Sequence, residues 1–256
     1  MKIAVINIYN FPVGMAPTTR IIGYCKGLLQ AGAKVDIISV VPKKETDKKE
    51  PLSGVCDGGN YYHFTHAPSC TIPILRSIAW RVKDYYSQKR ALTFIKESDQ
   101  QEPYDAVIMS FDEPSRFEVI VPILKRLQKA KVIAIADEYP IPIRHCLKHF
   151  VPESKLRRYR AVYKDIDGRI LMTANLQNFY DTNVCPKPTL ILSTIVDVDR
   201  FKNLVKEKQE RDYLCYMGNM ELSKDNVDNI IESFALVSDK YTDLDFHLYG
   251  APKQET

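Results

Sequence analysis

The sequence lacks several patterns that define common protein classes. No apolar run reaches the ~18 residues that a membrane-spanning helix needs. There is no G-x-G-x-x-G after the first apolar run and no G-x-x-x-x-G-K-[ST] anywhere. These absences argue against a dinucleotide-dependent enzyme of the Rossmann type and against a P-loop enzyme.

The spacing of the cysteines and the small net charge also exclude some classes of protein. The six cysteines include no C-x-x-C pair and no zinc-finger spacing with histidine. This usage predicts a reduced, cytosolic protein. The net charge of +4 over 256 residues is too small for the basic surface of a nucleic-acid-binding protein, so no nucleic-acid partner is expected.

The first residues form a short apolar run that could be mistaken for a secretory signal. Polar Asn7, Tyr9 and Asn10 interrupt it and no small-residue cleavage site follows, so residues 3–8 are predicted to be a buried strand. Apolar residues at helical spacing come next, Gly32 ends that helix, and residues 35–41 are a second strand. This is a βαβ unit with parallel strands.

The same alternation continues to Ser193 and predicts an α/β fold with a doubly wound parallel sheet. We count roughly six strands, at 3–8, 35–41, 106–109, 132–136, 169–172 and 189–192. Helices are expected between them, at 74–95, 114–130, 156–166 and from the capping residue Thr173 onward.

A second unit follows a polar, lysine-rich stretch. Residues 1–198 are predicted to be one Rossmann-like domain, 199–211 a linker, and 212–256 the start of a second such domain. Its strands are expected at 213–217 and 246–249, with a helix at 227–237. About 45 residues cannot close a core alone, so we expect this second domain to be truncated.

Four segments, taken in order, resemble glycosyltransferase family 4. They are Gly14 to Arg20 with Tyr24 to Leu28, Ala134 to Pro140, Asp167 to Thr173 with Thr194 to Phe201, and Tyr216 to Asn226. The resemblance implies the GT-B fold of two facing Rossmann-like domains, with residues 1–198 on the acceptor side. It also implies sugar transfer with retention of configuration and without a metal or other cofactor.

The resemblance further implies the substrates. The donor is a nucleotide sugar, UDP- or GDP-linked, and the acceptor is a carbohydrate or a lipid-linked molecule, as in cell-surface polysaccharide or glycolipid synthesis. The location expected is the cytoplasm, including the inner face of the membrane. The family's E-x7-E pair of glutamates would lie beyond Thr256, so the sequence as given is expected to transfer sugar poorly.

The predicted phosphate-binding residues are two glycines and a lysine. Gly14 and Gly218 let the backbone approach a diphosphate, and Lys224 precedes a helix and can contact the same group. Alternatively, Gly14 is an ordinary turn residue and Lys224 an ordinary surface residue. Arg20 stands early in its helix, where a cation is unfavourable, so we expect it to contact a phosphate or an acidic acceptor, or to be a surface arginine.

Four acidic residues are expected at the carboxyl ends of strands, where α/β sheets bind ligands. Asp137 and Glu138 are the predicted catalytic residues, because a carboxylate can orient or deprotonate an acceptor hydroxyl. Asp112 and Glu113 are assigned to the acceptor side, with helix N-capping as the competing role.

Three further features leave alternatives open. His145 and His149 share a helix face, but Arg144 and Lys148 would repel a metal ion, so no metal site is assigned. Residues 74–95 combine Trp80 and tyrosines with arginines, a pattern compatible with ordinary helix packing or with contact to an anionic membrane. The strand at 246–249 is expected to be an exposed edge open to self-association.

Two other functions remain as alternatives to the enzyme. One is an α/β binding or regulatory domain without catalysis, and the other is a nucleotide-cofactor enzyme of another type. The second is disfavoured by the missing glycine motifs named above.

Overall fold

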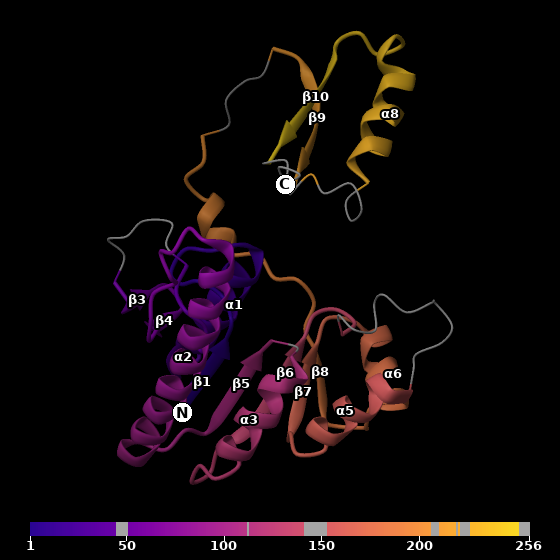
Figure 1. Ribbon diagram of the computed structural model, residues 1–256. Coiled ribbons are helices and arrows are strands. Elements are labelled where there is room, and N and C mark those ends of the chain that lie inside the picture. The colour runs from indigo at the N-terminus through magenta and orange to yellow at the C-terminus, as the bar shows by residue number, and fades with distance from the viewer. Residues whose placement is uncertain are drawn as a thin grey trace. The chain divides into compact units, whose positions relative to one another are not determined.

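The computed structural model describes residues 1–44, 51–111, 113–140, 153–205, 210–218, 220 and 226–250. Contacts divide the chain into two compact units, Met1–Asp197 and Val198–Thr256 (Figure 1).

The first unit is an α/β domain built on an eight-stranded sheet. Its elements in chain order are β1 Lys2–Asn7, α1 Ala16–Gln30, β2 Lys34–Ser39, β3 Ser53–Cys56, β4 Gly59–Tyr62, α2 Pro73–Gln101, β5 Ala106–Ser110, α3 Pro114–Leu124, β6 Lys131–Ala136, α5 Glu153–Tyr163, β7 Gly168–Leu171, α6 Ala174–Asn183 and β8 Thr189–Ile191. The strand order is β3-β4-β2-β1-β5-β6-β7-β8, and all neighbours are parallel except β3 and β4. The predicted doubly wound sheet is confirmed.

Both faces of the sheet are buried, and successive side chains of a strand point to opposite faces. Ala4 and Ile6 of β1 lie in one core cluster with apolar residues of α2, α3, α5 and α6. Ile3 and Val5 lie in a second cluster with residues of α1. Continuous apolar strands of this kind are typical of a parallel sheet covered by helices.

The predicted number of strands was wrong, since β3 and β4 were missed. They form a hairpin whose exposed residues hide the apolar pattern, and in β4 only Tyr61 is buried. Gly59 begins β4 with φ +116°, and a Cβ there would lie 2.6 Å from the carbonyl oxygen of Val35. This close approach to β2 explains why glycine is needed where a strand was not expected.

Three predicted helix ends were also wrong, and one of them is that of α5, which ends at Tyr163 and not at residue 166. The helix α3 ends at Leu124 and not at residue 130, and it contains Pro122, which lacks a backbone donor, in its last turn. The helix α2 continues to Gln101, six residues beyond the expected end. Its last carbonyl groups accept hydrogen bonds from the ammonium of Lys2, at 2.9 Å from both Ser98 O and Glu102 O.

The second unit contains the 3-10 helix η1 Val198–Phe201, β9 Asp212–Met217, α8 Val227–Ser238 and β10 Leu244–Tyr249. The strands β9 and β10 pair in parallel, with Leu214 opposite Phe246. They form a sheet of their own and do not extend the first sheet. The predicted second βαβ unit is therefore present, whereas the roles assigned to the two units stay predictions.

Candidate functional site

The strand order creates a crossing point between β1 and β5. After β1 the chain moves to β2 on one side of the sheet, and after β5 it moves to β6 on the other side. In Figure 1 the strands β1, β5 and β6 lie side by side in the first unit. A crevice forms at the carboxyl ends of strands where the order reverses in this way, and α/β proteins bind ligands there.

Arg20 and Asp137 form an ion pair at this edge of the sheet. Arg20 is the fifth residue of α1, and Asp137 follows the last residue of β6. Their side chains are 18% and 20% exposed, so the pair is largely shielded from water. The Asp137 carboxylate is thus an anion that compensates the cation near the start of the helix.

Four polar atoms of the pair and of other residues of α1 and β5 lack a partner among the described residues. They are Arg20 Nε, Asp137 Oδ1, the hydroxyl of Tyr24 on α1 and Ser110 Oγ at the end of β5. Ser110 is only 2% exposed. Buried polar groups are normally hydrogen-bonded, so donors and acceptors left open near one strand edge mark a place where a polar ligand can bind.

The environment changes the acidity of three groups at this edge. Burial raises the pKa of Asp137, Arg20 opposes this effect, and Glu138 adds to it. Burial also raises the pKa of Tyr9, reinforced by Asp137 and partly offset by Arg20, and burial raises the pKa of Tyr24. A carboxylate with a raised pKa is a better proton acceptor, which suits interaction with a hydroxyl group.

Glu113 and Glu138 lie near this edge but differ in their contacts. Glu113 occupies the N-cap position of α3 without a capping hydrogen bond from its side chain. Instead its Oε2 accepts a hydrogen bond from Arg116 Nε at 2.5 Å, and Arg116 also pairs with Asp84 at 3.0 Å. Glu138 is exposed, and its charge raises the pKa of both Tyr9 and Asp137. Asp112 lies outside the described residues.

Two of the three predicted phosphate-binding residues, Gly14 and Gly218, lie in the described part of the chain. Gly14 precedes α1, and a Cβ there would lie 2.9 Å from Asn10 O and even nearer Thr18 Oγ1, which donates to Asn10 O at 2.9 Å. Gly14 therefore has a role in the packing of its own turn, and phosphate binding stays a prediction. Gly218 follows β9 in the second unit and donates its N–H to Tyr249 O at 3.0 Å. Lys224 lies outside the described residues.

Metal ligands are not gathered at any point of the described chain. No group of three or more His, Cys, Asp or Glu side chains there could hold an ion. Aspartates with one residue between them occur at 165/167, 197/199 and 243/245, but Asp167 is engaged by Lys125 and Asp197 by Lys26. His145 and His149 lie outside the described residues.

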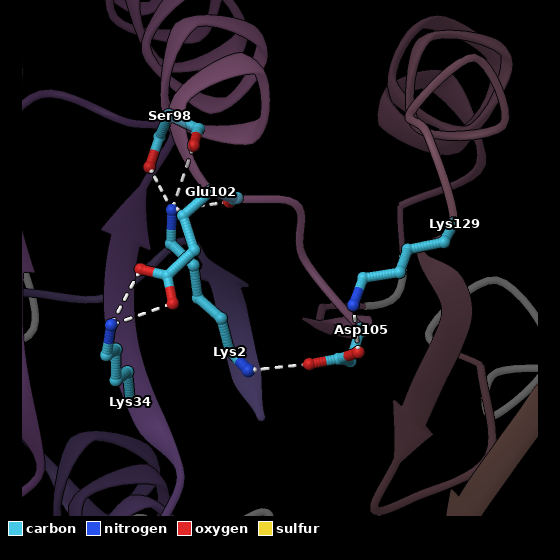
Figure 2. Close-up of polar contacts among 6 residues, drawn as sticks. All are labelled: Lys2, Lys34, Ser98, Glu102, Asp105 and Lys129. Atoms are coloured by element: carbon cyan, nitrogen blue, oxygen red, sulfur yellow. Dashed lines mark hydrogen bonds and ion pairs between the residues drawn. The ribbon is translucent and has the colours of Figure 1, made fainter.

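A hollow of about 670 Å³ lies at the other end of the sheet. Its polar groups bind each other: Lys2 Nζ donates to Ser98 and Glu102 O, and Lys34 Nζ donates to the Glu102 carboxylate at 2.7 Å (Figure 2). Lys129 and the Lys2 N–H both bind Asp105 in the same way. At this end of the sheet these polar groups are bonded to one another. At the carboxyl edge, in contrast, several polar atoms have no partner among the described residues.

Sequence reasoning missed Tyr9, Tyr24 and Ser110. Tyr9 and Ser110 stand at the ends of β1 and β5, so the criterion that selected Asp137 could have selected them too. Tyr24 follows Arg20 by four residues and lies on the same side of α1. Only the order of strands in the sheet, in which β1 and β5 are neighbours, shows that these residues lie at the same edge.

No protein-family model and no curated protein matches the sequence. Among solved structures, the chain is similar to sucrose-phosphate synthase from Thermosynechococcus elongatus, with a TM-score of 0.67 and 13% identity over 99% of this chain and 64% of that one. It is also similar to UGT2 of Phytolacca americana, complexed with UDP-2fluoro-glucose and pterostilbene (TM-score 0.57, 12% identity, 98% of this chain and 71% of that one). A glycosyltransferase from Rickettsia africae matches with a TM-score of 0.52 and 12% identity, over 98% of this chain and 69% of that one.

At these identities the similarity establishes the fold alone. The chain shares the mixed α/β architecture of GT-B glycosyltransferases over nearly its whole length. It spans 64% of the length of the sucrose-phosphate synthase chain.

Proposed function

We propose that this protein is a glycosyltransferase that takes a sugar from a nucleotide-diphosphate sugar and transfers it to an acceptor hydroxyl. The observation that carries the proposal is the group of Arg20, Asp137, Tyr24 and Ser110 at the crossing point of the sheet, each with a polar atom that has no partner in the described part of the chain. The shared fold of nucleotide-sugar-dependent enzymes supports it.

The chemistry of this edge suits an acceptor sugar. A hydroxyl that attacks the donor must be oriented and must lose its proton, and Asp137 Oδ1 is an acceptor with no partner among the described residues. Arg20 holds the other carboxylate oxygen, so the open oxygen keeps a defined position. Asp137 is the proposed catalytic or positioning carboxylate, with Glu138 beside it.

The proposal includes the finer assignments that the family resemblance implies. These are family 4, retention of configuration, a UDP- or GDP-linked donor bound without a metal by the glycine turns and Lys224, and a carbohydrate or lipid-linked acceptor. The process is cell-surface polysaccharide or glycolipid synthesis at the cytoplasmic face of a membrane.

A thermal-unfolding screen tests the donor class. UDP- and GDP-sugars are added to the chain, with the matching free sugars and nucleoside monophosphates as controls. Binding to the native state stabilises it by about 2.7 kcal/mol at a ligand concentration of about 100 times Kd. A saturable rise of the midpoint with one nucleotide sugar supports the proposal, whereas a rise that the free sugar or the nucleoside monophosphate reproduces in full contradicts it.

A further inference from the structure

The first half of α2 carries an exposed apolar stripe. Seven large apolar side chains are 49% to 74% exposed there: Ile72, Ile74, Leu75, Ile78, Val82, Tyr85 and Tyr86. Two interpretations were open for residues 74–95. Ordinary helix packing holds for the second half of α2, where Ala91, Leu92 and Ile95 are buried.

The stripe points away from the body of the first unit. Ile74, Ile78 and Val82 follow one another at four-residue spacing and so share one side of the helix. The protein-facing side is marked by Ser87, which is buried and hydrogen-bonded to Thr65 at 2.6 Å. Ser87 lies two residues after Tyr85, which is about 200° around a helix of 3.6 residues per turn.

Positive charge accompanies the stripe. Residues 73–90 carry five cations and one carboxylate, so this segment alone has the net charge of the whole chain, +4. The carboxylate, Asp84, is held by Arg116 at 3.0 Å. Four of the five cations have no ion-pair partner within the described part of the chain: Arg76, Arg81, Lys83 and Lys89.

A hollow at the start of α2 adds one further cation, Lys44. It has a volume of about 430 Å³ and is lined by Lys44, Thr71, Pro73, Arg76, Ser77 and Trp80. Lys44 Nζ lies 5.8 Å from the centroid of the Trp80 ring. Two cations, two hydroxyls and an indole at one rim form a surface that is complementary to a phosphate-bearing headgroup.

We propose that the first half of α2 docks on an anionic lipid bilayer, with the apolar stripe inserted between headgroups and the cations on the phosphates. A helix with exposed aliphatic and tyrosine side chains flanked by unpaired cations has the composition of an interfacial helix. The contact is peripheral, since no helix in the described ranges is both long enough and apolar enough to cross a bilayer. The inference does not depend on sugar transfer.

Vesicle co-sedimentation of the 256-residue chain tests this docking. The probes are phosphatidylcholine vesicles with and without phosphatidylglycerol, at low and high salt. The chain is expected to bind only the anionic vesicles and to be released by salt. Replacing three cations (R76Q, R81Q and K83Q together) is expected to weaken partitioning by about 100-fold, at roughly fivefold for each cation.

Matched controls separate the surface from general charge and hydrophobicity. R126Q, R157Q and K164Q together remove the same charge from other exposed positions and are expected to leave binding unchanged. I74S with I78S is expected to abolish binding, whereas V55S with V119S, also at exposed positions, is not.

Three outcomes overturn the proposal. One is no binding to anionic vesicles by the unmodified chain, and another is equal loss of binding in the test and control variants. The third is a dimer that I74S with I78S dissociates, in a chain that does not bind vesicles, because the stripe is then covered by a second copy.

Discussion

At the scale of residues, the candidate site depends on one ion pair between distant parts of the chain. Arg20 and Asp137 are 117 positions apart in the sequence and meet because β1 and β6 both flank β5. Burial raises the pKa of Asp137, and Arg20 limits that rise. Arg20 therefore favours the ionised form of the carboxylate at a place where water is largely excluded.

Arg20→Gln is expected to raise the pKa of Asp137 further and to destabilise the fold by about 2 kcal/mol at pH 7, because a buried carboxylate loses its charged partner. The pKa of Asp137 in the folded state then lies further above its unfolded value. The loss of stability is therefore present above the folded pKa and disappears as pH falls below the unfolded value. Urea unfolding at pH 7 and pH 4 measures the difference, and carboxyl ¹³C titration measures the pKa.

Lys129→Gln is the control for this variant, since Lys129 pairs with Asp105 at the opposite end of the sheet. It should leave the titration of Asp137 unchanged. An unaltered Asp137 pKa in Arg20→Gln would show that the two groups do not interact in solution.

The sequence predicts the acids of the site better than their partners. Asp137 follows an apolar run and so stands at a strand end, which a local pattern reveals. The contact with Arg20 and the unpartnered Ser110 depend on the order of strands in the sheet, which no local pattern encodes. Lys224, predicted from a motif, and Asp112, predicted from its place at a strand end, lie outside the described residues.

At the scale of elements, local signals predict helix starts well. Thr173 was expected to cap a helix, and its Oγ1 accepts a hydrogen bond from the Leu176 N–H at 3.2 Å at the start of α6. This helix begins directly after β7 and buries Leu176 and Tyr180 against the sheet. The capping bond thus fixes where the chain leaves the sheet edge.

Thr173→Ala is expected to lower the free energy of unfolding by about 1 kcal/mol, because a helix N–H loses its acceptor. Urea denaturation of the variant and of the parent chain checks this. Thr182→Ala, at an exposed position of the same helix, is expected to show no loss. Equal effects of the two variants would contradict the capping role.

Signals for short strands and helix ends are weaker. In the hairpin of β3 and β4, β4 has one buried side chain, so the sequence of this strand shows almost no alternation of apolar and polar residues. The strand β4 is instead positioned by its pairing with β2. The length of α2 depends on Lys2, which lies 96 residues before Ser98. Long-range contacts of this kind determine element boundaries and are not visible in a window of sequence.

At the scale of the whole molecule, the alternation of apolar strands and amphipathic helices predicts the α/β class and the separate second sheet. It predicts these features because a parallel sheet needs apolar strands joined by helices. Self-association through the β10 edge stays a prediction. The function is proposed from the crossing point of the first sheet, where ligand binding would be decided by atoms of three different strands and α1.

We propose that the carboxyl ends of β1, β5 and β6 form the acceptor site of a glycosyltransferase. Amide chemical-shift mapping with the nucleotide sugar selected by the thermal screen, followed by titration of candidate acceptor saccharides, tests it most directly. The account predicts saturable shifts by an acceptor at Tyr9, Ser110 and Asp137. Shifts confined to the opposite end of the sheet, around Lys2 and Glu102, or no acceptor-dependent shifts in the first unit, would contradict it.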